Sequence, residues 1–245
     1  MARLAGEHGI EFVFLTADMG YHQGDWQSLI GFYRARTAIG SKAFPKTCTD
    51  RLKIAPIYSF LEFWLARNYV LSARRRKRAF YEFGARYGPI RMLIGLAADE
   101  RGRIESAAES ASSGRKWMLG TIDRVYPLAE IGFDRAAAQR YIASVGRTVP
   151  PPSVCERCPW ANDLELLYLW TFRREQFDEW AELEARKLAK WKHLGRKNVG
   201  VWGKPDLPLE AVLERVKRRY PQYVEKPEML AEYRFSHGHC VRSKY

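Results

Sequence analysis

Cys48-Thr49-Asp50-Arg51-Leu52-Lys53-Ile54-Ala55-Pro56 is the stretch around which the rest of the chain can be placed. Pro56 biases the residue before it toward extended backbone, so we expect a turn here before a helix over residues 57–69 begins. Arg51 and Lys53 would then lie near the start of that helix, where free N–H groups and the helix dipole attract anions. The stretch therefore predicts a phosphate or sulfate site. The alternative is a solvated loop with a buried, inert Cys48.

The composition indicates a soluble chain with a polyanionic partner. Among 245 residues, 41 Lys and Arg outnumber 28 Asp and Glu, and the formal charge of +13 favours nucleic acid over a membrane surface. Residues 1–10 lack the apolar core of a signal peptide, and no stretch reaches the roughly 18 apolar residues that span a bilayer. Four unevenly spaced cysteines do not suit a small secreted disulfide scaffold, so we expect a cytoplasmic protein.

Two apolar runs are predicted to be buried strands, and each is followed by polar residues. Residues 12–15 precede a loop that contains Asp18, Gly20 and His22. Because open α/β sheets bind ligands where their strands end, Asp18 could accept a hydrogen bond from a ribose or base, and Gly20 allows close backbone approach. The alternative is that Asp18 simply forms a turn and His22 lies at the surface.

The second predicted strand covers residues 91–96 and leads to Asp99, Glu100 and Arg103. Glu100 and Arg103 could hold a nucleotide or orient a water molecule. A local ion pair, worth little energetically, would place the same residue types at the same spacing. Both interpretations remain open at this point.

Helical spacing of apolar residues predicts several helices, and much of the positive charge accompanies them. The predicted ranges are 25–37, 57–69, 135–145, 177–194 and 209–220. The run at residues 74–78 could neutralise several phosphates, or it could be a solvated helix end or linker. In the basic region 161–245, aromatic residues interleaved with Lys and Arg could stack on single-stranded nucleic acid, although such a stripe usually packs in a core.

The cysteines suggest a metal site or a redox pair. Cys155 and Cys158 have the two-residue spacing that lets two thiolates face one metal ion or pair with each other. Cys48 and Cys240 are the other cysteines, and the four thiolates together could hold a [4Fe–4S] cluster or zinc. The alternative is a reactive pair at Cys155 and Cys158 beside buried, unliganded Cys48 and Cys240.

Three stretches, taken in order, resemble the phosphoadenosine-phosphosulfate (PAPS) reductase family of the adenine nucleotide alpha-hydrolase superfamily, especially its phage and mobile-element members. Residues 12–22 are similar to a strand followed by an Asp-Thr-Gly-like loop, and residues 48–56 carry a Cys-Thr-x-Arg-x-Lys-x-x-Pro pattern. Residues 94–103 are similar to a Gly-Ile-Arg-x-x-Glu segment. Tyr-Pro-Leu at 126–128 and Cys-x-x-Cys-Pro at 155–159 complete the set.

The resemblance implies an α/β fold with a doubly wound, mainly parallel sheet over residues 1–160 and a largely helical, basic part over 161–245. It implies ATP or a related adenine nucleotide as ligand, Mg²⁺ as a further candidate, and α-phosphate chemistry linked to sulfur transfer or to modification of DNA or tRNA. The catalytic residues implied are Cys48, Arg51, Lys53 and Glu100. The nucleotide-binding residues are Asp18, Gly20, His22, Asp99 and Arg103, and the ligands of a [4Fe–4S] cluster or zinc are Cys48, Cys155, Cys158 and Cys240.

Two departures from the family pattern qualify these expectations. Ala97 occupies the position where the reductases carry an arginine, which weakens the case for a sulfonucleotide substrate. The Ser-Gly-Gly-x-Asp-Ser pyrophosphate loop does not occur in the sequence either, nor does a Gly-x-x-x-x-Gly-Lys substitute. We therefore expect an N-terminally truncated fold with unpaired apolar sheet surface near residues 12–15. The rival to an enzyme is a non-catalytic, nucleic-acid-binding remnant of the same fold.

Overall fold

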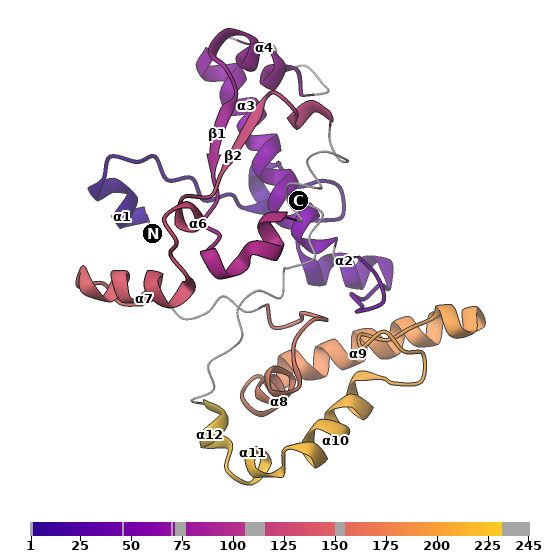
Figure 1. Cartoon of the computed structure of the whole chain (residues 1–245). Coiled ribbons are helices and arrows are strands. Elements are labelled where there is room, and N and C mark those ends of the chain that lie inside the picture. The colour runs from indigo at the N-terminus through magenta and orange to yellow at the C-terminus, as the bar shows by residue number, and fades with distance from the viewer. Residues whose placement is uncertain are drawn as a thin grey trace.

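The computed structural model describes residues 2–45, 47–69, 71, 77–105, 116–149 and 155–231 (Figure 1). The described chain is mixed α/β and mostly helical. Its α-helices are α1 (Ala2–Glu7), α2 (Leu29–Arg36), α3 (Ala55–Tyr69), α4 (Arg78–Tyr87), α6 (Pro127–Glu130), α7 (Arg135–Ser144), α8 (Asp163–Phe172), α9 (Arg174–Lys190), α10 (Leu209–Arg219), α11 (Pro221–Glu225) and α12 (Pro227–Ala231). Short 3₁₀ turns are η1 (Ala17–Met19), η3 (Ala98–Glu100), η4 (Lys116–Met118) and η5 (Lys192–Lys197).

The sheet in the described residues has two parallel strands, β1 (Ile90–Leu93) and β2 (Ile122–Val125). They pair in register from Ile90 opposite Ile122 to Leu93 opposite Val125. The strand predicted at 91–96 is thus present, but it ends three residues earlier than expected. The prediction that this strand is buried is wrong, because its residues alternate between half-buried and exposed and Leu93 is 71% exposed. Parallel pairing agrees with the predicted α/β class, whereas a doubly wound sheet would need further strands and stays a prediction.

One predicted strand is wrong. Residues 12–15 form no ladder with either strand, and Phe12 and Phe14 are 46% and 73% exposed. A short apolar run can be a buried strand only if another strand offers free N–H and C=O groups and a neighbouring layer covers its side chains. β1 pairs with β2, and residues 12–15 obtain neither a partner strand nor burial.

The stretch at 48–56 is helical throughout, so the predicted turn before the helix is also wrong. A π-helical turn, η2 (Asp50–Ile54), runs directly into α3, and the Ala55 N–H bonds to the Asp50 carbonyl five residues back. Ala55 has right-handed helical angles of φ −62° and ψ −43° despite the proline that follows it. A wider π turn is one way in which a helix relieves the steric conflict of a proline in its first turns.

A first hydrophobic core lies under the sheet. It is formed by α3, α4 and the residues just before β2, with Tyr58, Leu65, Ala79, Phe80 and Met118 buried at its centre. Sheet residues pack against it from one face of β1 and β2. This core holds α3 in place, and therefore also the η2 turn that precedes it.

A second core belongs to the C-terminal helices α8 to α12, which lie together at the bottom of Figure 1. The predicted helices near 135–145, 177–194 and 209–220 are confirmed as α7, α9 and α10, with small shifts of their ends. The carboxylate of Glu184 is 2% exposed and accepts hydrogen bonds from the Val201 N–H at 2.6 Å and from the N–H of Leu209, the first residue of α10. Burial raises the pKa of Glu184, and these two hydrogen bonds counteract the rise in part.

A short segment after α2 joins the two cores. Ile39 packs against the second core, the Ser41 hydroxyl donates to the Gly200 carbonyl at 2.7 Å, and the Lys42 N–H donates to the Val201 carbonyl at 2.9 Å. Within the described residues, no helix has the length and apolar character needed to cross a membrane. Residues 74–76 of the predicted basic run lie outside the described residues, as does Cys240.

Candidate functional site

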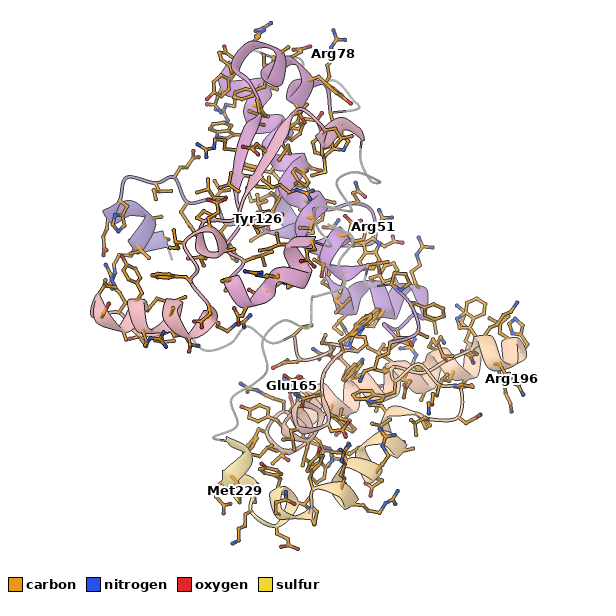
Figure 2. All side chains as sticks on the ribbon, viewed as in Figure 1. Arg51, Arg78, Tyr126, Glu165, Arg196 and Met229 are labelled. Carbon is orange, nitrogen blue, oxygen red and sulfur yellow. The ribbon has the colours of Figure 1, made fainter. Side chains whose placement is uncertain are left out.

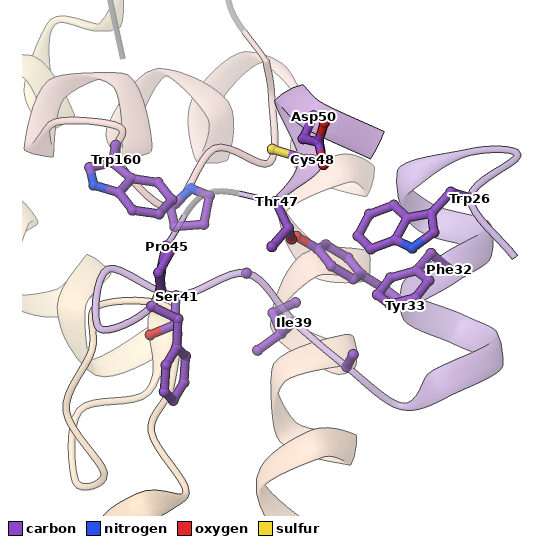
Figure 3. Close-up of a pocket in the computed structure, with 14 residues that line it drawn as sticks. Trp26, Phe32, Tyr33, Ile39, Ser41, Pro45, Thr47, Cys48, Asp50 and Trp160 are labelled. Atoms are coloured by element: carbon purple, nitrogen blue, oxygen red, sulfur yellow. The ribbon is translucent and has the colours of Figure 1, made fainter. Parts of the chain in front are cut away.

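A cavity of about 410 Å³, here called the aromatic cavity, lies between α2 and the start of the η2–α3 helix. Figure 3 shows Trp26, Phe32 and Tyr33 on one side, Trp160 on the other, and Cys48 and Asp50 at the helix start. Trp26 and Phe32 stack with centroids 3.7 Å apart. The cavity is lined by Trp26, Phe32, Tyr33, Ala38, Ile39, Gly40, Ser41, Phe44, Pro45, Thr47, Cys48, Asp50, Pro159 and Trp160.

Tyr33 is a buried aromatic side chain in the wall of this cavity, at 5% exposed. Burial is the main cause that raises the pKa of its hydroxyl, and the neighbouring thiols of Cys48, Cys155 and Cys158 raise it further, against a hydrogen bond with the Gly40 backbone. A Cβ on Gly40 would lie 2.6 Å from the Tyr33 hydroxyl and 2.7 Å from Cγ of Pro159, so only glycine fits here without a shift. The sequence predicted Tyr33 only as an apolar position of the helix over 25–37, and it predicted neither Tyr33 nor Gly40 as a site residue.

The fold brings three of the four cysteines toward one place. Cys48 lines the aromatic cavity, and Cys158, 4% exposed, directly precedes Pro159 and Trp160 in its wall. Cys155 is exposed. No cluster of three or more His, Cys, Asp or Glu side chains suited to a metal ion occurs within the described ranges, which exclude Cys240. The four-cysteine cluster or zinc site therefore stays a prediction.

A second cavity of about 460 Å³, the polar cavity, lies on the other side of the η2 turn. Asp50 lines both cavities, whereas Arg51 lines only the polar one. Arg51 Nη1 donates to Gln23 Oε1 at 2.9 Å, and its Nε lies 4.0 Å from Asp50 Oδ2. The lining is Gln23, Asp50, Arg51, Ala55, Tyr58, Ser59, Lys77 and Trp117.

Lys77 is the second cation of the polar cavity and was expected only as part of a basic run. Its ammonium donates to Glu62 Oε2 at 2.7 Å and lies 5.7 Å from the ring centroid of Trp117. The backbone of Lys77 is left-handed, with φ 64°, at the start of α4. Lys53, by contrast, is exposed and lines neither of these two cavities.

The loop with Asp18, Gly20 and His22 lies against α3. Gly20 has φ 78° and closes the η1 turn, and Tyr21 packs edge-on against Phe60 with centroids 5.4 Å apart. A hydrogen bond with the Thr16 side chain is the main cause that lowers the pKa of Asp18. The loop reaches the polar cavity through Gln23, since Asp18, Gly20 and His22 do not line it.

Glu100, Asp99 and Arg103 form an ion-pair cluster with α7. Glu100 Oε1 accepts from Arg103 and lies 3.0 Å from Arg135 Nη2, and Asp99 Oδ1 accepts from the Arg135 N–H at 3.2 Å. Burial alone would raise the pKa of Glu100, but a hydrogen bond from the Ala97 N–H and the two arginines outweigh it and hold the pKa below its usual value. The pairing of Glu100 with Arg103 is the local ion pair that the sequence left open as an alternative. Asp99, Glu100 and Arg103 line neither cavity.

Positive charge is spread over both parts of the molecule. Figure 2 shows Arg78 at the top of the sheet-bearing part, Arg51 at the helix start near its base, and Arg196 at the outer end of the C-terminal helices. The two cavities therefore stand out by their shape and lining, rather than by charge alone.

The chain matches no family model, no curated protein and no solved structure.

Proposed function

We propose that this chain binds an adenine nucleotide across the η2 turn, with the base in the aromatic cavity and the phosphates at Arg51 in the polar cavity. One observation carries the proposal: the side chain of Asp50 lines both cavities. In a nucleotide, the ribose joins the base to the phosphate. The η2 turn has the aromatic cavity on one side and the cation Arg51 on the other, which matches this order of groups.

The size and lining of the two cavities support this proposal. Volumes of about 410 and 460 Å³ lie in the range of small-molecule sites, roughly 300–1,000 Å³. Every base offers an aromatic face for stacking, and each stacked base is worth about 1–3 kcal/mol by alanine substitution. Arg51 and Lys77 bring two positive charges to the polar cavity. Lys77 is paired with Glu62 at 2.7 Å, whereas Arg51 lies 4.0 Å from Asp50, so the loosely held Arg51 is the cation that would bind an anion.

The chemistry that we propose is attack at the α-phosphate of ATP or a related adenylate, linked to sulfur transfer or nucleic-acid modification. Arg51 would stabilise the negative charge that develops on the phosphate in the polar cavity. Cys48 lines the aromatic cavity and not the polar one, so its role as the sulfur nucleophile stays a prediction of the resemblance. Lys53, Glu100 and the other residues implied by the resemblance line neither cavity, so their roles stay predictions.

The binding step is tested by calorimetry with AMP and ATP. We expect Arg51→Ala to weaken AMP binding at least about tenfold, because a charge-assisted bond to phosphate is worth about 1.5–3 kcal/mol. Arg91→Ala is the matched control, because Arg91 is an exposed arginine on β1 with a loose 4.0 Å contact to Asp123. Equal AMP affinity in the wild-type protein and Arg51→Ala would contradict the proposed phosphate site.

Catalysis is tested separately by the release of pyrophosphate from ATP. We expect release from the wild-type protein and a loss of it in Arg51→Ala. A protein that binds AMP but leaves ATP intact would keep the binding site and exclude the α-phosphate chemistry.

A second candidate function, nucleic-acid binding without catalysis, is supported by the cations that lie over Trp170. Lys217 Nζ lies 3.9 Å from the Trp170 ring centroid, and the Arg174 guanidinium lies 5.5 Å from it. Such a pair of cations around a half-buried indole is the kind of surface on which single-stranded nucleic acid stacks. Binding of a fluorescent single-stranded oligonucleotide that is weakened by Trp170→Ala, resists competition by AMP and falls steeply with salt would favour this function.

A further inference from the structure

Cys155 and Cys158 lie on one hydrogen-bonded turn and differ sharply in exposure. The Cys158 N–H donates to the Cys155 carbonyl at 3.1 Å, which closes the turn. Cys155 is exposed, whereas Cys158 is 4% exposed. An exposed thiol next to a buried one is the arrangement of an attacking and a resolving cysteine, because a bulky disulfide can reach only the first.

A half-buried ammonium lies near the second cysteine. Lys42 Nζ donates to the Ala161 carbonyl at 3.2 Å, and the Ala161 N–H in turn donates to the Cys158 carbonyl at 2.9 Å. Lys42 is half-buried, which lowers its pKa, while the nearby Asp163 and Cys158 act in the opposite direction. These two hydrogen bonds place the Lys42 cation near the turn that carries Cys158, and a nearby cation favours the thiolate, the form that attacks a disulfide.

The turn also borders the aromatic cavity. Pro159 and Trp160, the next residues after Cys158, form part of its wall, and Cys48 lines the same cavity. Oxidation of the turn would therefore act directly beside the proposed base site. The exchange itself requires no bound nucleotide, so it can be tested whether or not AMP binds.

We propose that Cys155 and Cys158 form a redox-active dithiol that is oxidised by low-molecular-weight disulfides. The Cys155 thiolate attacks one sulfur of the disulfide, forms a mixed disulfide and releases the first thiolate. The Cys158 thiolate then attacks the Cys155 sulfur, forms the Cys155–Cys158 disulfide and releases the second thiolate. The two cysteines together lose two electrons and two protons, and the small disulfide is reduced to two thiols.

The sequence provides a direct way to detect this bond. Arg157 lies between the two cysteines, so trypsin separates them into the peptides 148–157 and 158–173. After incubation of the full chain with oxidised glutathione and digestion in denaturant, we expect these two peptides to be joined by a disulfide. In Cys158→Ser we expect peptide 148–157 to carry one glutathione instead, and Cys48→Ser is the control that keeps the joined pair.

Three results would overturn the dithiol. The first is free thiols or separate glutathione adducts on both peptides of the wild-type protein. The second is a bond from peptide 158–173 to the peptide that contains Cys48. The third is a stoichiometric amount of zinc or iron in the purified protein, with thiols that react only after a chelator is added, since bound metal would then account for the pair.

The role of Lys42 has its own readout, the rate at which the joined pair forms. We expect Lys42→Met to slow the conversion of mixed disulfide to joined pair about tenfold, because the resolving thiolate loses its cation. Lys190→Met is the control, because it removes a lysine at the end of α9, more than twenty residues after Cys158 in sequence. An unchanged rate in Lys42→Met would refute the proposed role of the ammonium. The dithiol itself is tested separately by the tryptic peptides.

Discussion

Gly40→Ala tests whether the contact that closes the aromatic cavity also holds the two parts of the chain together. The added Cβ would lie 2.6 Å from the Tyr33 hydroxyl and 2.7 Å from Cγ of Pro159. Both neighbours are rigid rings, and Tyr33 is 5% exposed, so neither can swing into open solvent. The backbone or one ring must therefore move.

The expected cost follows from what such overpacking does in other cores. Forcing one methyl group into a filled site costs about 1–3 kcal/mol, and for a chain of this size each kcal/mol lowers the melting temperature by about 2–4 °C. We therefore expect a loss of about 2 kcal/mol and a melting temperature lower by roughly 4–8 °C. Binding of AMP should weaken as well, because Gly40, Tyr33 and Pro159 all line the aromatic cavity.

The measurement is urea unfolding followed by tryptophan fluorescence, with thermal unfolding as a second probe. Gly6→Ala is the matched control, because Gly6 lies in α1 with nothing within 4 Å of its added Cβ. This control should be neutral or stabilising by up to about 1 kcal/mol, as expected for alanine in place of glycine in a helix. Gly40→Ala with the stability and AMP affinity of the wild-type protein would refute the close packing on which the aromatic cavity depends.

Two further predictions concern buried carboxylates, and both use denaturant unfolding across pH. Glu184→Ala should cost about 2–6 kcal/mol at pH 7, because two backbone N–H groups lose their acceptor, at about 1–3 kcal/mol each. Because the pKa of Glu184 is raised in the folded protein, its stabilising contribution should grow as pH falls toward 4.5. If the free energies of unfolding of the wild-type protein and Glu184→Ala differed by the same amount at every pH, this prediction would be contradicted. The pKa of Glu100 is lowered in the folded protein instead. Its contribution to the free energy of unfolding is therefore present above pH 4.5 and is lost as pH falls through the lower folded pKa. The destabilisation by Glu100→Gln should be largest near neutral pH and should vanish in acid. A Glu100→Gln effect that does not shrink as pH falls below 4.5 would show that shape, and not charge pairing, matters there.

Helices with regular apolar spacing were predictable. α9 and α10 were recognised because burial of one face requires apolar residues at a period near 3.6, and this spacing can be read from the local sequence. α7 was predicted as well, although none of its residues is buried. β1 was recognised from a short apolar run, which is also a local feature of the sequence. Residues 12–15 have an equally apolar composition but no strand to pair with, and composition alone does not reveal the missing partner.

The candidate site was predictable only in part. Cys48 and Arg51 were selected from their own stretch, and both line a cavity. Tyr33, Gly40, Gln23 and Lys77 were not predicted as site residues, because each lines a cavity through a neighbour that is distant in sequence. The pairing of Glu100 with Arg135 shows the same limit, since a partner on a different helix decided what a correctly noticed acidic residue does.

The sequence by itself determined the local elements, the excess of positive charge and the residue types that could do chemistry at 48–51 and 155–158. Only the tertiary structure decided which of these residues share a cavity, and it placed Asp50 between an aromatic and a polar one. The physical reason is the separation in sequence of the residues that decide each feature. Helix formation and charge depend on residues a few positions apart, whereas a cavity is enclosed by side chains from segments more than a hundred residues apart, and it exists only once two cores have packed around it.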